Sequence, residues 1–130
     1  AKHPEHAWKV VREAETAGPG LFLKTHPKSE NVWTDATFAK DGNSNQTICV
    51  FKKKDFDADP TCFSATEHGK IVHFEYNKAG DEVWASVWDR KGALIVYDDK
   101  TLKEKARIEA DWMVTPTGKW NVYNTVHDVY

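Results

Sequence analysis

Residues 72–88 read VHFEYNKAGDEVWASVW and predict two short strands joined by a tight turn. Apolar and polar residues alternate on both sides of the tetrad NKAG at residues 77–80, whose composition is typical of a hairpin turn. The same pattern occurs earlier, where residues 21–33 read LFLKTHPKSENVW. Trp84 follows Trp33 by 51 positions in this alignment of the two stretches. The chain is therefore built on an internal repeat.

The repeat divides the chain into units of about four strands each. The first unit spans residues 7–67, the second spans 68–111, and a partial third unit spans 112–130. A weak alternation over Ala7 to Glu15 predicts an additional edge strand ahead of the first repeat. The strands expected within the two full units are 21–25, 31–37, 46–52 and 61–64, then 71–76, 82–88, 93–97 and 103–109.

This spacing predicts an all-β chain of two to three four-stranded antiparallel blades of a β-propeller. A closed propeller typically has four to eight blades. The 130 residues suffice for fewer than three blades of about 45 residues. The chain is thus expected to be a fragment of a longer protein, or to be completed by another copy or subunit. A small β-sandwich with two similar halves is the alternative.

Composition excludes some classes of partner. The formal net charge of −2 leaves no basic surface for nucleic acid, and no long apolar run spans a membrane. Cys49 and Cys62 each fall in a strand-like run, so the burial preference of cysteine favours free buried thiols over a disulfide. The sequence has no nucleophile elbow, phosphate loop, CxxC pair or CxxCH haem-attachment motif. Generic motifs alone therefore indicate no catalytic site.

His73 is the most informative polar residue of the repeat. It follows Phe22 by 51 positions, so the two are expected at equivalent places on the first strands of neighbouring blades. That strand lies nearest the axis of a propeller, where an aromatic ring and an imidazole could contact a flat cofactor. Alternatively, His73 is a histidine on a strand face with its hydrogen bonds satisfied by the fold. The residue pattern leaves both interpretations open.

Four segments carry a resemblance to a known family. GLFLKTHPKSENVW, FEYNKAGDEVWASVW, LIVYDDKTLKEKA and the terminal TPTGKWNVYNTVHDVY resemble, in order, the C-terminal part of the d1-haem domain of cytochrome cd1 nitrite reductases. The resemblance implies an eight-bladed propeller that holds haem d1, with haem c in a separate domain. It also implies one-electron reduction of nitrite to nitric oxide during denitrification in the periplasm, by a homodimer supplied with electrons by a small c-type cytochrome or cupredoxin.

The resemblance also assigns site residues one by one. Phe22 matches an aromatic residue beside the d1 macrocycle, and Thr117 and Gly118 match a loop that approaches the same haem. His73 falls where the family has glutamine, which makes it a further cofactor-binding candidate. The axial histidine and the two proton-donating histidines belong to blades upstream of Ala1, so no catalytic residue or metal ligand is expected in this chain.

Three functions are therefore carried forward. The first is the C-terminal portion of a haem d1-dependent nitrite reductase, which supplies one wall of the haem pocket and is inactive as an isolated fragment. The second is a propeller that binds d1-type haem during its synthesis or transport, an alternative that the histidine at position 73 keeps open. The third is a non-catalytic fragment that associates with itself through open sheet edges.

Overall fold

A computed structural model of the chain describes residues 3–114, 120 and 122. Eight strands form two antiparallel sheets, and each sheet is a meander in which neighbours along the chain pair. The described helices are two short 3-10 turns, η1 (Pro4–His6) and η2 (Ser44–Gln46), and none is long and apolar enough to cross a membrane. The strands are β1 (Leu23–Thr25), β2 (Asn31–Thr34), β3 (Thr47–Lys52), β4 (Thr61–Ser64), β5 (Lys70–Tyr76), β6 (Glu82–Trp88), β7 (Ala93–Asp98) and β8 (Glu104–Glu109).

The hairpin between β5 and β6 confirms the prediction from residues 72–88, and its turn explains the sequence found there. The Asn77 side-chain oxygen accepts hydrogen bonds from the backbone N–H groups of Gly80, Asp81 and Glu82. Gly80 has a φ of +79°, a left-handed conformation that costs glycine little. A side chain at this position would also collide with the His26 ring, which lies beside the turn.

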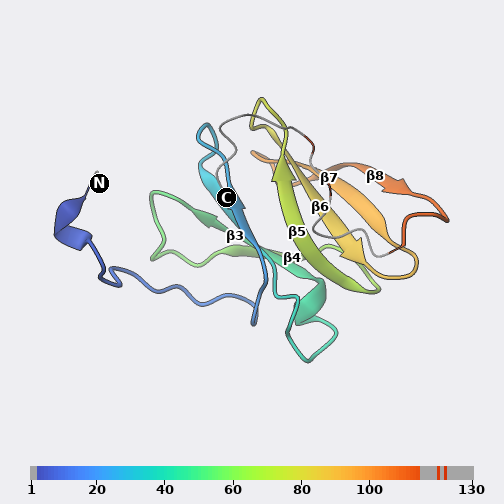
Figure 1. Cartoon of the computed structure of the whole chain (residues 1–130), viewed down its shortest axis with the longest axis horizontal. Coiled ribbons are helices and arrows are strands. Elements are labelled where there is room, and N and C mark those ends of the chain that lie inside the picture. The colour runs from blue at the N-terminus through green and yellow to red at the C-terminus, as the bar shows by residue number, and fades with distance from the viewer. Residues whose placement is uncertain (1–2, 115–119, 121, 123–130) are drawn as a thin grey trace.

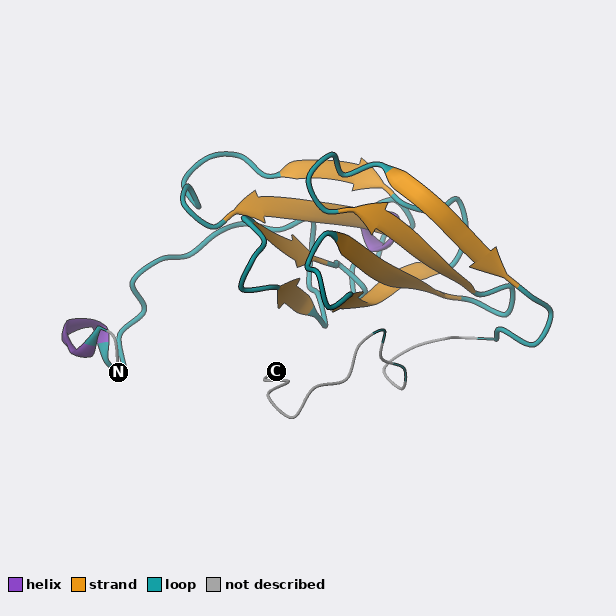
Figure 2. Ribbon diagram, turned by 90° about the horizontal axis from the view of Figure 1, so that it is seen from above, coloured by secondary structure: helices purple, strands orange, loops and turns teal. Residues whose placement is uncertain are grey.

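The two sheets stack face to face and share one apolar core (Figure 2). Trp33 on β2 is fully buried at its centre. Its ring lies 6.1 Å from that of Phe63 in its own sheet and 5.6 Å from that of Tyr97 in the second sheet, measured between centroids. Burial of large aromatic side chains dominates the stability of such cores. The repeated tryptophan of the first unit therefore joins the two sheets.

A buried carboxylate also ties the sheets together. Asp99, which directly follows β7, accepts hydrogen bonds from the Trp33 indole (2.8 Å), the Tyr76 hydroxyl (2.7 Å) and the Ser29 hydroxyl (2.7 Å). Burial, together with the neighbouring Asp99 carboxylate, raises the pKa of Tyr76 above its usual value, so the phenol stays protonated and remains a donor. Because Trp33 and Ser29 come from the first sheet, the contact fixes how the second sheet is placed.

The expectation of free thiols is wrong, because Cys49 and Cys62 form a disulfide. The two residues face each other in the register of β3 and β4, with their Cα atoms 4.1 Å apart. Directly opposed residues of antiparallel strands are close enough for such a bond. The burial preference of cysteine pointed the other way, but Cys62 is exposed on the outer strand while only Cys49 is buried.

The expected edge strand over residues 7–15 is also wrong. This segment has no regular secondary structure, and Figure 1 shows it running away from the two sheets toward the N-terminus. Its apolar side chains are exposed, with Trp8 fully so and Val10 at 79%. A strand without a neighbour lacks hydrogen-bond partners for its backbone groups, so a weak alternation of apolar and polar residues is not enough to form one. The expected strands of the third unit lie mostly outside the described residues; Trp112 to Val114 form none.

Candidate functional site

The first strands of the two sheets, β1 and β5, are edge strands of their sheets and lie next to each other. Phe22 directly precedes β1, and His73 lies within β5. Their rings are 4.9 Å apart between centroids with planes tilted by 45°. The repeat had predicted that these two residues occupy equivalent positions on neighbouring first strands, and the structure places them in direct contact.

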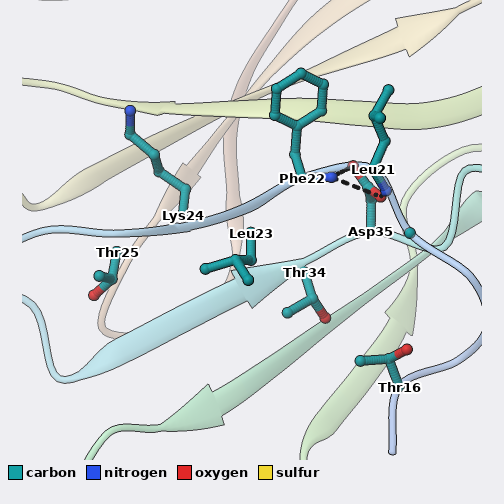
Figure 3. Close-up of a pocket in the computed structure, with 9 residues that line it drawn as sticks. Thr16, Leu21, Phe22, Leu23, Lys24, Thr25, Thr34 and Asp35 are labelled. Atoms are coloured by element: carbon teal, nitrogen blue, oxygen red, sulfur yellow. Dashed lines mark hydrogen bonds between the residues drawn. The ribbon is translucent and has the colours of Figure 1, made fainter. Parts of the chain in front are cut away.

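A β-bulge in β5 decides where His73 points. The register with β6 shifts between Val72 and Phe74, and His73 adopts a φ of +64° that is uncommon for a residue with a side chain. The buried carboxylate of Asp35 accepts hydrogen bonds from the backbone N–H groups of His73 (3.4 Å), Leu21 (2.7 Å) and Phe22 (3.2 Å). Figure 3 marks the bonds from the Phe22 N–H to the Asp35 carboxylate. Asp35 thus holds the bulge against the start of β1.

The His73 ring is part of a row of ionisable groups, His73, Glu75 and Lys24, of which His73 and Glu75 are buried. Its Nε2 lies 3.0 Å from Glu75 Oε1, and Glu75 Oε2 lies 3.1 Å from Lys24 Nζ. Burial alone raises the pKa of the Glu75 carboxyl, but the hydrogen bonds with His73 and Lys24 outweigh it and hold the pKa below its usual value. With Glu75 ionised, His73 Nε2 carries the proton and donates it to the carboxylate. Lys24 and Glu75 are 51 positions apart, so the repeat brings these opposite charges together.

Trp120 completes the surroundings of His73. Its ring centroid lies 4.9 Å from that of the imidazole in an edge-on arrangement, whereas the Phe22 ring is tilted by 45° to the imidazole. The Trp120 indole N–H is buried and has no acceptor in the described part of the chain. His73 itself is only 3% exposed. The imidazole therefore contacts two aromatic rings, and one of them, Trp120, has an indole N–H without an acceptor among the described residues.

A cavity of about 660 Å³ lies beside this row, along β1 and the residues before it. It is lined by apolar groups of Leu21, Phe22 and Leu23, and by Thr34 and Asp35 (Figure 3). Leu23 and Phe22 point to opposite sides of the strand in this view, as the twofold alternation of a strand requires. The volume is in the range of small-molecule sites.

Of the four residues predicted to bind the cofactor, the structure describes two. Phe22 and His73 come together, whereas Thr117 and Gly118 lie outside the described residues. Asp35, Glu75 and Trp120 were missed, although the repeat offered a signal for Glu75 through its equivalence with Lys24. Among the described residues, no group of three or more His, Cys, Asp or Glu side chains is arranged to hold a metal ion.

The family model for the cytochrome d1 haem domain matches residues 1–125. The chain belongs to this family. It is 44% identical over 143 aligned residues to a nitrite reductase from Stutzerimonas stutzeri, with all of this chain and 26% of the relative covered. It is 37% identical over 120 residues to the dihydro-haem d1 dehydrogenase from Pseudomonas aeruginosa, with 92% of this chain and 23% of the relative covered.

A solved structure supports the same assignment. The dihydro-haem d1 dehydrogenase NirN in complex with DHE superimposes with a TM-score of 0.76 and 34% sequence identity, over 88% of this chain and 23% of that one. The two sheets are therefore blades of a β-propeller, and the β-sandwich alternative is set aside. The chain spans about a quarter of the length of the relatives it matches.

Proposed function

We propose that this chain is the C-terminal portion of a periplasmic haem d1-dependent nitrite reductase, which converts nitrite to nitric oxide, and that it forms one wall of the haem d1 pocket. The supporting observation is the 44% identity to a nitrite reductase over the whole chain, above the 37% identity to the dehydrogenase. The complete protein is proposed to act as a homodimer in denitrification, with electrons from a small c-type cytochrome or cupredoxin that reach haem d1 through haem c in its separate domain.

The residues at the inner strands suit a flat cofactor that carries carboxylates. Phe22 offers a partly exposed ring for packing against a macrocycle. The buried Trp120 indole N–H lacks an acceptor among the described residues, and a cofactor carboxylate or carbonyl oxygen would provide one. Haem d1, when bound, supplies the iron that binds nitrite and passes it one electron. These residues hold and orient the group; the axial ligand and the proton donors are expected upstream of Ala1.

His73 supports this wall by packing against Phe22 and Trp120. Its link through Glu75 to Lys24 fixes the orientation of its ring. The Thr117–Gly118 segment is proposed to approach the same haem. Packed aromatic rings keep water from the space they enclose, which strengthens polar contacts to a bound cofactor. In this proposal the chain binds, orients and shields, and performs no proton transfer of its own.

The disulfide supports the proposed compartment. Structural disulfides form and persist in oxidising environments such as the bacterial periplasm and are rare in the cytosol. The bond between Cys49 and Cys62 is therefore in keeping with a periplasmic protein. A chain kept reduced in the cytosol would lose this cross-link.

A second candidate is a propeller that binds d1-type haem during its synthesis. It is favoured by the 37% identity to a dihydro-haem d1 dehydrogenase and by the superposition on that class of structure. The replacement of the family's glutamine by His73 also changes the chemistry at the pocket wall. The two candidates differ in which haem the wall prefers.

Titration of the chain with haem d1, followed by its visible spectrum, tests the proposal. We expect saturable binding that Phe22→Ala, Trp120→Phe or His73→Ala weakens by at least tenfold. Phe38→Ala is the matched control, because the Phe38 side chain is 52% exposed. A haem d1 spectrum that the chain leaves unchanged would show that this chain does not bind haem d1. Tighter binding of dihydro-haem d1 than of haem d1 would favour the second candidate.

A further inference from the structure

The disulfide between Cys49 and Cys62 has one buried half and one exposed half. Cys49 is 1% exposed and lies in a small apolar cluster with Val32 and Phe51, against which Phe56 packs. Cys62 lies directly opposite on β4 and is exposed. Exchange of a disulfide requires a thiolate to reach one of its two sulfur atoms. A thiolate from outside the molecule therefore has access at Cys62 and not at Cys49.

Cys62 also belongs to an edge strand. Within the described part of the chain, β4 pairs with β3 alone, so the other side of its backbone has no strand partner. The neighbouring Thr61 and Ser64 are exposed as well. An edge of this kind can accept an extended segment of another protein through main-chain hydrogen bonds. The exposed cysteine is therefore presented within a segment that a partner protein can bind.

β4 reaches the junction of the two sheets through Phe63. The Phe63 ring lies 6.1 Å from that of Trp33 and 5.5 Å from that of Tyr97, measured between centroids. β4 is only four residues long, and the disulfide adds a covalent tie between it and β3. Strands with few buried contacts open readily by local unfolding. Whether the bond is closed or open thus decides how firmly Phe63 is held in the core.

We propose that the Cys49–Cys62 bond is a thiol–disulfide exchange site for a dithiol oxidoreductase that docks along β4. The first thiolate of the partner attacks the Cys62 sulfur. The Cys49–Cys62 bond then breaks, a bond between the partner and Cys62 forms, and Cys49 leaves with the electron pair and takes a proton from water. The second thiolate of the partner displaces Cys62, so the partner is oxidised by two electrons and both cysteines become thiols. No step involves haem, so the exchange is independent of the proposed function.

The two cysteines have different roles in this exchange. Cys62 accepts the outside thiolate because it is exposed. Cys49 is shielded, and buried cysteines in apolar surroundings are inert toward outside reagents. Cys49 still faces Cys62 across the strand pair, with the two Cα atoms 4.1 Å apart, so it has a high effective concentration toward any adduct on Cys62. Cys49 is therefore the resolving thiol, which expels the adduct and closes the bond again.

Trapping the mixed disulfide tests the exchange on the natural chain. The probe is a thioredoxin whose second active-site cysteine is replaced by serine, so that the adduct cannot be resolved from the side of the probe. We expect a covalent adduct that peptide mapping assigns to Cys62, with none on Cys49. An adduct on Cys49 would overturn the proposal. So would the absence of an adduct under conditions in which dithiothreitol opens the bond, because the site would then admit small thiols only.

The urea dependence of reduction by dithiothreitol separates an exchange site from a purely structural bond. Attack on the folded chain should proceed at the same rate in water and in urea below the unfolding transition. A rate that rises with urea as steeply as the unfolding equilibrium constant would show that the bond opens only in unfolded molecules, and would overturn the proposal. After reduction, the backbone amides of β4 should exchange with water about tenfold faster, whereas those of β6 should not change. Unchanged exchange in β4 would contradict its release.

Two single substitutions test the division of roles, and they are matched because each removes the same bond. With oxidised glutathione as the probe, Cys49→Ser should form a lasting mixed disulfide at Cys62. Cys62→Ser should react about tenfold more slowly, because its remaining thiol is buried. The reduced natural chain should show no lasting adduct, since Cys49 expels it. Equal modification of the two variants, or a lasting adduct on the natural chain, would overturn the assignment of Cys49 as the resolving thiol.

Discussion

Asp99→Ala should be among the most destabilising single substitutions in this chain. It removes the acceptor shared by three buried donors, on Trp33, Tyr76 and Ser29. The Tyr76 hydroxyl can still donate to the Ser29 Oγ, 3.1 Å away, so two donors lose their acceptor. Each donor left unsatisfied costs about 1–3 kcal/mol, so we expect a loss of roughly 4 kcal/mol in the free energy of unfolding. At a urea dependence of about 2 kcal/mol/M, the midpoint should fall by about 2 M.

Urea titration followed by tryptophan fluorescence measures this shift, with circular dichroism as a second probe of the same transition. Asp98→Ala is the matched control, since it removes a carboxylate one residue away that caps an exposed turn through Thr101 and Lys100. Its effect should be clearly smaller. If Asp99→Ala moved the midpoint no further than Asp98→Ala, the carboxylate would not be what joins the two blades.

Three further predictions concern other features. Replacement of Cys49 and Cys62 by serine should cost about 2–3 kcal/mol, because the bond closes a loop with a sequence separation of 13; a thiol reagent should find no reactive cysteine until the protein is reduced. Glu75 has a lowered pKa, so its ionised form stabilises the fold above the ordinary pKa of glutamate, and this stabilisation is lost as the pH falls through the lowered pKa. Glu75→Gln should therefore have a lower urea midpoint than the natural chain at pH 7 and the same urea midpoint in acid. A difference in urea midpoint that stays constant with pH would contradict this prediction. Gly80→Ala should cost about 1–2 kcal/mol through its positive φ and the nearby His26 ring, whereas Gly42→Ala, which has open space around it, should change the thermal midpoint little.

The sequence predicted most strands because alternation and turn residues are local signals. β6 begins and ends where the pattern of residues 82–88 placed it, and β4 coincides with residues 61–64. The repeat of 51 residues added long-range information, since it placed Phe22 and His73 at equivalent positions of neighbouring units, and their rings are in contact in the structure. Local alternation without a partner was not enough at residues 7–15, where no strand forms.

Features that depend on the register between paired strands could not be predicted from local sequence patterns. The Cys49–Cys62 bond requires the two residues to face each other across β3 and β4, and the loop between these strands sets that register. The bulge that turns His73 toward Trp120 is likewise a single-residue irregularity. The three donors to Asp99 come from segments up to 70 positions away, and only the packed sheets assemble them.

The Cys49–Cys62 bond also determines how the first blade responds to mechanical force. Tension applied to the two ends of the chain can separate β3 from β4 only as far as the cross-link permits, so the loop between the cysteines stays out of the extending polypeptide. With a separation of 13 residues, the oxidised chain should reach a contour length about 45 Å shorter than the reduced one. The outermost strand thus stays tethered to its neighbour under load, which keeps it from being exchanged with the edge of another molecule.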